Sequence, residues 1–140
     1  TQHVLWPGEP PRAGDVVVFD SPADGVRLIK RVVAIAGDVV AVRRGRVWID
    51  GEPTWEAADR SGAAPVERYD SRRIPLNLGA GGGPDLQPIV VPEGQVLVLG
   101  DHRGNSRDGR FFGFVPAASL YGKAERVFWR RGVGPSWRQL

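Results

Sequence analysis

The sequence predicts a mainly β fold with little helix. Its 140 residues include 19 glycines and 12 prolines, which favour turns over long helices. Short valine-rich runs recur between these turn residues, and runs of β-branched residues are typical of strands. With 41% hydrophobic and 25% charged residues, the composition is that of an ordinary folded chain, and the length fits one domain.

Turn residues bound each predicted strand. The first strand falls within 14–22 and the longer second one within 26–38, and residues 39–52 predict a hairpin that turns around Arg44 and Gly45. Two further strands and one helical turn complete the pattern, at residues 89–101, 121–130 and 115–120 respectively.

Residues 55–88 interrupt this pattern. They contain RSGAAP, RRIP and GAGGGP, with scattered apolar residues and no clear period. We expect an extended insertion or flap that covers the main sheet, and a mobile surface loop is the alternative. The core of a single domain over 1–140 is therefore assigned to about 12–54 and 89–130.

Composition excludes several kinds of site and partner. The chain has no cysteine, which excludes disulfides, thiolate catalysis and cysteine-based zinc sites. Its net charge of +3 comes from scattered arginines without a basic helix, so nucleic acid is not an expected partner. No run of about 18 apolar residues is present that could span a membrane. Because the chain starts at Thr1 and lacks methionine, we expect it to be the downstream part of a longer product.

Lys30 is the first candidate for chemistry. Side chains alternate between the two faces of a strand, which predicts that Lys30 shares one face with Leu28, Val32 and Ala34. The other face would carry Arg31 with Ile29, Val33 and Ile35. A lysine among aliphatic side chains loses hydration, which lowers its pKa and fits it to act as a general base. The alternative is a lysine whose amine reaches water from a half-exposed strand.

A charged, glycine-rich stretch follows the apolar run QVLVL. This stretch, GDHRGNSRDGRFFGFVP, and the earlier IKRVVAIAGD together resemble the two signature boxes of bacterial type I signal peptidases, membrane-anchored serine proteases that use a Ser-Lys dyad. The first box is met at Lys30, Arg31, Val32, Val33, Gly37 and Asp38. The second is met at Gly100, Asp101, Arg103, Asn105, Ser106, Asp108 and Arg110, with the Gly-Phe-Val-Pro tail at 113–116.

The resemblance covers most of the chain outside 55–88. RAGDVVVF at 12–19 and GKAERVFW at 122–129 also look like their family counterparts. It implies an antiparallel β-sheet or partly open barrel core with an inserted flap. The chain would lie on the extracytoplasmic face of a bacterial cytoplasmic membrane.

The resemblance also implies a role for each matched residue. Lys30 would be the general base, and the Ser106 hydroxyl would donate a hydrogen bond that orients its amine. Asp101 would pair with Arg31, and Asp108 with Arg110, with Arg103 and Asn105 as further structural support. His102 occupies a variable position and is interpreted as a loop residue. A plain charged turn is the alternative for this whole stretch.

The nucleophile of the family is missing from these residues. It sits in an upstream Ser-x-x-Pro box beyond a transmembrane segment, and the remaining serines have no such setting: Ser21, Ser61, Ser71, Ser119 and Ser136. We therefore expect these 140 residues alone not to cleave a preprotein. Turnover by the purified chain that Lys30→Ala abolishes would contradict this expectation.

For the intact protein, the implied reaction is acyl transfer by a serine and a neutral lysine, without a cofactor. Its partners would be secreted preproteins with small residues at the cleavage site, and the membrane surface. No metal is implied, since the two histidines, His3 and His102, belong to no ligand cluster. Aromatic residues could touch lipid at Trp6, Phe111, Phe112, Phe128, Trp129 and Trp137, although 111–114 could equally be core.

Three alternative functions remain open from the sequence. A catalytically silent relative would keep the sheet and the charged loop and bind peptides or partner proteins without cutting them. A self-cleaving repressor of the SOS type shares the dyad and a related fold, but it would carry a DNA-binding domain and is not expected to carry this charged box. A conjugation-type pilus-processing peptidase would differ mainly in its substrate.

Overall fold

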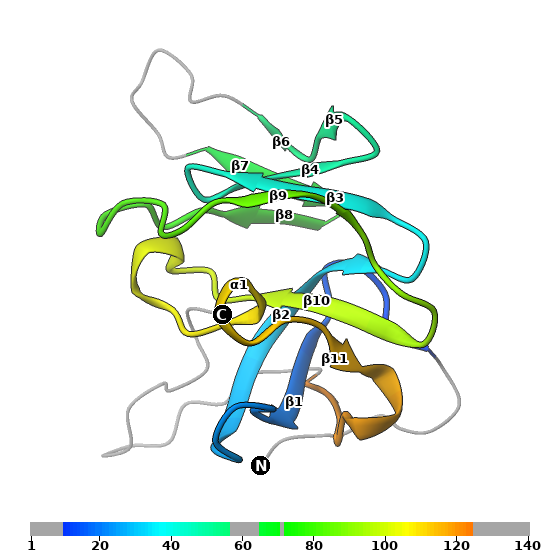
Figure 1. Ribbon diagram of the computed structural model, residues 1–140. Helices are drawn as coiled ribbons and strands as arrows, with labels where there is room; N and C mark the ends of the chain where they lie inside the picture. Colours follow the sequence, from blue (N-terminus) through cyan, green and yellow to red (C-terminus); the bar gives the residue numbers. More distant parts are fainter. Residues whose placement is uncertain (1–9, 57–64, 71, 125–140) are drawn as a thin grey trace.

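The computed structural model describes residues 10–56, 65–70 and 72–124. Figure 1 shows that strands make up most of the molecule and that the helices are short. The strands are β1 Val16–Asp20, β2 Arg27–Ile35, β3 Val39–Arg43, β4 Arg46–Ile49, β5 Glu52–Pro53, β6 Trp55–Glu56, β7 Val66–Tyr69, β8 Arg72–Pro75, β9 Leu86–Val90, β10 Gln95–Leu99, β11 Val115–Pro116 and β12 Gly122–Ala124. The helices are α1 Gly109–Phe112 and two 3₁₀ turns, Arg103–Asn105 and Ala117–Ser119. The predicted mainly β fold is confirmed.

A five-stranded antiparallel sheet, in the order β11-β10-β2-β1-β12, carries the matched motifs. The ladder between β2 and β10 has a bulge, because Leu97 faces Ala34 while the next residue, Val98, faces Val32. Val33 is therefore the extra residue of β2. The bulge puts Val33 and Ala34 into the same core cluster, so the strict alternation predicted beyond Val32 is wrong.

A four-stranded sheet, β5-β4-β3-β9, and a three-stranded sheet, β6-β7-β8, lie above the five-stranded sheet in the view of Figure 1. The predicted hairpin at 39–52 is confirmed as β3 and β4. Arg44 and Gly45 both have positive φ at its turn, which is the geometry of a tight two-residue hairpin loop. Part of 55–88, where no period was predictable, forms the short strands β6, β7 and β8 and the beginning of β9.

Both faces of the five-stranded sheet are buried. On the side of the other two sheets, Leu97 and Leu99 of β10 pack with Val42 and Tyr69. On the opposite side, Val96 and Val98 pack with residues of β1, β2 and β11. There Phe112 of α1 stacks edge-on against Phe19, with ring centroids 5.9 Å apart. The sheet lies between these two clusters, and the charged loop of residues 100–110 follows directly from its strand β10.

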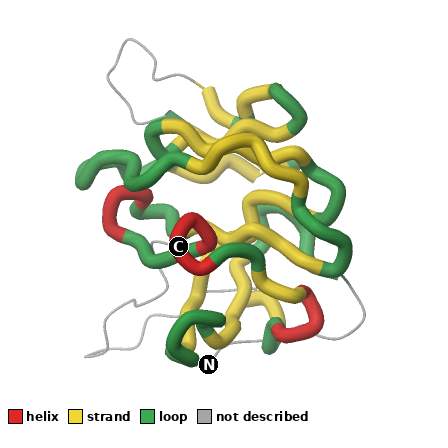
Figure 2. The backbone as a smooth tube through the Cα atoms, in the orientation of Figure 1, coloured by secondary structure: helices red, strands yellow, loops and turns green. Residues whose placement is uncertain are grey.

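The C-terminal part of the described chain is short and irregular. The helical turn predicted within 115–120 is the 3₁₀ turn Ala117–Ser119, shown in red near the bottom of Figure 2. The strand predicted over 121–130 begins as β12, and its part beyond residue 124 lies outside the described residues. None of the helices in the described part of the chain has the length and apolar character needed to cross a membrane.

Candidate active site

Lys30 and Ser106 meet where β10 leaves the five-stranded sheet. The last pair between β10 and β2 joins Leu99 to Arg31, so the chain of Gly100 continues alongside Lys30. The Lys30 Nζ donates a hydrogen bond to the Ser106 Oγ at 3.0 Å. A Cβ atom on Gly100 would lie only 2.1 Å from that Oγ. Glycine is therefore required at position 100 if the two side chains are to meet.

The surroundings of Lys30 favour its neutral form. Lys30 is half-buried. Its β1 neighbour Val17 belongs to the apolar cluster on the face of the five-stranded sheet that points away from the other two sheets. Burial lowers the pKa of the Lys30 ammonium below its ordinary value, and the carboxylates of Asp108 and Asp101 only partly oppose this, while Arg110 adds to it. The amine thus loses its proton at a lower pH than a solvent-exposed lysine does.

Asp101 and Arg31 tie the start of the charged loop to β2. The Arg31 Nε and one terminal nitrogen donate to the two Asp101 oxygens at 3.0 and 2.9 Å, and the other terminal nitrogen donates to the Gly14 carbonyl at 2.8 Å. Both side chains are buried. The expected contact is present, and its two parallel hydrogen bonds fix the angle as well as the distance between the loop and the strand.

Asp108 and Arg110 close the loop on itself. The Asp108 carboxylate accepts hydrogen bonds from the Gly100 N–H at 3.1 Å and from the Arg110 N–H at 3.1 Å, so that it caps the short helix α1. It also accepts two bonds from the Arg110 guanidinium, at 2.9 and 2.8 Å. The same guanidinium donates to the carbonyls of Arg103 and Gly82. The two ends of the loop are therefore held at Gly100, beside the Lys30 amine.

Arg103 forms a buried ion pair that sequence reasoning missed. Its guanidinium donates two hydrogen bonds to the Glu67 carboxylate, at 2.6 and 2.7 Å, and neither side chain is exposed. The Tyr69 hydroxyl donates to the same carboxylate at 2.6 Å. Burial lowers the pKa of Arg103, but the charge and hydrogen bonds of Glu67, together with Tyr69 and Asp101, more than offset this and raise it. Two further Arg103 N–H groups donate to the carbonyls of Gly100 at 2.7 Å and Gly45 at 2.6 Å.

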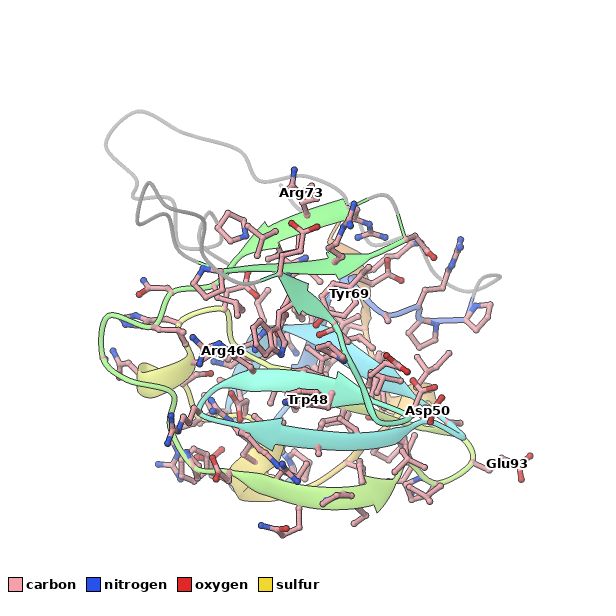
Figure 3. All side chains as sticks on the ribbon, turned by 90° about the horizontal axis from the view of Figure 1, so that it is seen from above. Arg46, Trp48, Asp50, Tyr69, Arg73 and Glu93 are labelled. Carbon is pink, nitrogen blue, oxygen red and sulfur yellow. The ribbon has the colours of Figure 1, made fainter. Side chains whose placement is uncertain are left out.

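The one signal for Glu67 in the sequence is the alternation within VERY, residues 66–69. In a strand, Glu67 and Tyr69 point to the same side, and in β7 both are buried. Figure 3 shows Tyr69 towards the body of the molecule, whereas Arg73 lies at the outer edge of β8. The alternation within 66–69 therefore predicts that the Glu67 carboxylate points inward, but it does not identify the arginine that the carboxylate binds.

The glycine tract of 79–83 also contacts the charged loop. Gly82 packs so closely on the β3–β4 turn that a Cβ atom there would lie 2.2 Å from the Arg44 carbonyl carbon. Just before the tract, Asn77 exchanges backbone hydrogen bonds with Asp101 and Arg103, both at 3.1 Å. Part of the predicted insertion is thus in direct contact with the loop that carries Ser106.

The other residues singled out from the sequence make local hydrogen bonds or lie outside the described part of the chain. Asn105 is exposed at the end of the 3₁₀ turn, and its N–H donates to the His102 carbonyl at 3.0 Å. Ser119 donates to the Pro116 carbonyl, and Ser21 accepts from the Ala23 N–H within a local turn. Ser61, Ser71 and Ser136 are outside the described residues. Within the described ranges, no three histidine, aspartate or glutamate side chains gather as metal ligands.

A surface pocket adjoins the candidate site. Leu28 lines it two residues before Lys30 on the same strand, and Arg107 lines it directly after Ser106. Its full lining is Ser21, Ala23, Asp24, Val26, Leu28, Arg107, Phe111 and Phe112. Phe111 is 59% exposed, whereas Phe112 is half-buried. Phe114 packs against the core cluster between the five-stranded sheet and the other two sheets. The other aromatic residues expected at a lipid surface, Trp6, Phe128, Trp129 and Trp137, lie outside the described residues.

The family model described as signal peptidase, peptidase S26, matches residues 3–129. The chain belongs to the signal peptidase family. A signal peptidase I of Leptolyngbya laminosa is 35% identical over 138 residues, covering 91% of this chain. A probable signal peptidase I-1 of Synechocystis sp. is also 35% identical, covering 99% of this chain. The resemblance identified from the two signature boxes is confirmed.

A solved structure agrees with the sequence relatives. The crystal structure of a signal peptidase I from Enterococcus faecalis matches with a TM-score of 0.55 and 29% identity, over 83% of this chain and 97% of that one. The matched regions are only part of the two sequence relatives, 58% of the Leptolyngbya protein and 64% of the Synechocystis protein. This signal peptidase family chain therefore spans about three fifths of their length.

Proposed function

We propose that this chain carries the general base of a signal peptidase I-type serine endopeptidase that removes signal peptides from secreted preproteins. The observation that supports this most strongly is the 3.0 Å contact between the Lys30 Nζ and the Ser106 Oγ on a half-buried face of β2. A depressed pKa, a fixed neighbour and an adjacent pocket are what a lysine needs to serve as a base near neutral pH.

In the proposed reaction, the neutral Lys30 amine accepts the hydroxyl proton of a nucleophilic serine supplied by another part of the intact protein. The serine oxygen attacks the carbonyl carbon of the scissile bond, and the lysine ammonium returns the proton to the leaving amine. Water then attacks the acyl-enzyme while Lys30 accepts its proton, and the lysine ammonium returns that proton to the serine oxygen as the signal peptide leaves. The groups that stabilise the oxyanion would come with the nucleophile.

Ser106 would act by orienting the amine. A lysine side chain has four rotatable bonds, so its nitrogen needs a fixed partner to keep its lone pair aimed at one hydroxyl. With one N–H of Lys30 donated to the Ser106 Oγ, the lone pair is left for the nucleophile. The sequence-based expectation has the opposite polarity, with the Ser106 hydroxyl as donor, and that polarity would occupy the lone pair which the nucleophile needs.

The backbone of β2 offers a place for an extended substrate. Residues 27–30 pair with β1 on one side, whereas β10 pairs with β2 only from Arg31 onward. Gly100 lies beside Lys30, but within the described ranges the second edge of 27–29 is not part of a ladder, and a peptide could add to it as a strand. Preproteins with small residues at the cleavage site would bind here, on the extracytoplasmic side of a membrane to which the intact protein is anchored.

The pH dependence of preprotein cleavage tests the proposal. Because the pKa of Lys30 is lowered, its neutral fraction increases as pH rises through that value, so kcat/KM of the full-length protein should rise along the same curve. N-terminal sequencing of the mature product would show where the preprotein is cut. A kcat/KM that stays flat across the Lys30 titration contradicts the proposal, and peptide binding without any cleavage supports the silent relative instead.

A further inference from the structure

Glu67 belongs to no part of the proposed reaction, yet it is among the most completely buried charges of the molecule. It lies on β7, outside both signature boxes, and its side chain has no exposed surface. A carboxylate is expensive to bury, and a buried ion pair is weak evidence for stability because the desolvation of both charges offsets their attraction. The position of this pair therefore calls for an explanation other than stability.

The contacts lead from Glu67 to the Lys30–Ser106 pair in two steps. The Glu67 carboxylate holds both terminal nitrogens of Arg103, and the Arg103 Nε donates to the Gly100 carbonyl at 2.7 Å. Gly100 is the residue against which the Ser106 Oγ and the Lys30 Nζ lie, within 2.1 and 3.4 Å of the site that its Cβ atom would occupy.

The residue Gly100 is fixed from both sides. Its N–H donates to Asp108 at 3.1 Å, within the charged loop, and its carbonyl accepts from Arg103. The first bond depends on the loop alone, whereas the second depends on Glu67, because a buried guanidinium without a counter-charge would be drawn towards water. Tyr69 adds a third constraint by donating to Glu67 at 2.6 Å.

We propose that Glu67 is a positioning residue for the Lys30–Ser106 pair, acting through Arg103 and the Gly100 carbonyl. The three-stranded sheet thereby sets the geometry of a site on the five-stranded sheet. The catalytic meaning of this link rests on the proposed function, but the link itself is a property of the 140-residue chain and can be measured without any cleavage assay.

The test is the NMR titration of the Lys30 side chain in the 140-residue chain carrying Glu67→Gln. The sequence has two lysines, Lys30 and Lys123, so a Lys123→Arg variant assigns the signals. We expect the Lys30 pKa to rise towards that of an ordinary lysine, because a displaced amine gains water. Loss of the Glu67 negative charge by itself would shift the Lys30 pKa downward, so the direction separates displacement from a simple charge effect.

A double variant keeps the test decisive if Glu67→Gln does not fold. Glu67→Leu with Arg103→Leu removes one charge of each sign and leaves no unpaired buried ion. It should fold and still raise the Lys30 pKa, because the Gly100 carbonyl has lost its donor. The matched control is Glu56→Gln, which breaks an exposed ion pair with Arg68 and Arg73 on the same three-stranded sheet and should leave the Lys30 titration unchanged.

An unchanged or lowered Lys30 pKa in either folded variant overturns the role of Glu67. That outcome differs from a failure of the proposed function, which would show as normal preprotein cleavage by full-length protein carrying Lys30→Ala. If Glu67 had only a structural role, Glu67→Gln would lower the free energy of unfolding but would leave the Lys30 pKa of the folded protein unchanged.

Discussion

Replacing Lys30 with alanine in the full-length protein is expected to lower kcat/KM for preprotein cleavage by about 10²–10⁴-fold, the usual contribution of a general base. The Lys30 amine is within 3.0 Å of Ser106, and its pKa is lowered by burial, so no water molecule would replace it with equal basicity and orientation. The measurement is steady-state cleavage of a preprotein, with circular dichroism to show that the variant is folded.

The matched control is Lys123→Ala. Lys123 lies on β12 at the edge of the five-stranded sheet, where its Nζ is 3.9 Å from Asp15 rather than near Ser106. This second alanine variant should cleave within a few-fold of the wild-type rate. Equal losses in the two variants, or full activity of Lys30→Ala, would show that Lys30 is not the base.

Arg103→Leu is expected to lower the free energy of unfolding of the 140-residue chain by about 3–5 kcal/mol, as for other buried ion pairs that lose one partner. The substitution leaves the Glu67 carboxylate charged and buried, and it removes the donor to the Gly100 and Gly45 carbonyls. Urea denaturation followed by circular dichroism gives the value. The midpoint should fall while the slope stays near that of the wild type.

Arg73→Leu is the control for this comparison. Arg73 pairs with Glu56 at 2.9 Å, but its side chain is 61% exposed, and exposed pairs contribute no more than about 1 kcal/mol. Adding Glu67→Leu to Arg103→Leu should recover a large part of the loss, because no unpaired charge is left inside. A single Arg103→Leu variant as stable as Arg73→Leu would mean that the buried pair is not maintained in solution.

The contacts Lys30–Ser106, Arg31–Asp101 and Asp108–Arg110 could be expected before the structure because each joins residues of the two signature boxes, whose resemblance to signal peptidases implies them. The strand pattern around Lys30 and the loop around Ser106 place Arg31 beside Asp101 once the two segments are adjacent. Asp108 and Arg110 are only two residues apart, so that their contact is local. These parts of the site need only the correct pairing of β2 with β10.

Other features depend on the tertiary structure. The bulge at Val33 comes from the way that β10 pairs with β2, and strict alternation along β2 alone cannot reveal it. Glu67 lies in a segment with no clear period, and its partner Arg103 is 36 residues away in the chain. The glycines of 79–83 lie in the segment expected to be a flap or a mobile loop, and their sequence does not indicate that Gly82 is needed for close contact with the β3–β4 turn. Such contacts arise only when the sheets pack together.

The titration of Lys30 in the 140-residue chain is the sharpest test of the proposed general base, because the reaction needs an amine that gives up its proton readily. The side-chain NMR signals of Lys30 would be followed as a function of pH. We expect Lys30 to lose its proton below the ordinary lysine value of about 10.4. If Lys30 titrates at or above that value, it is not the general base, because it would stay an ammonium ion where a base is required.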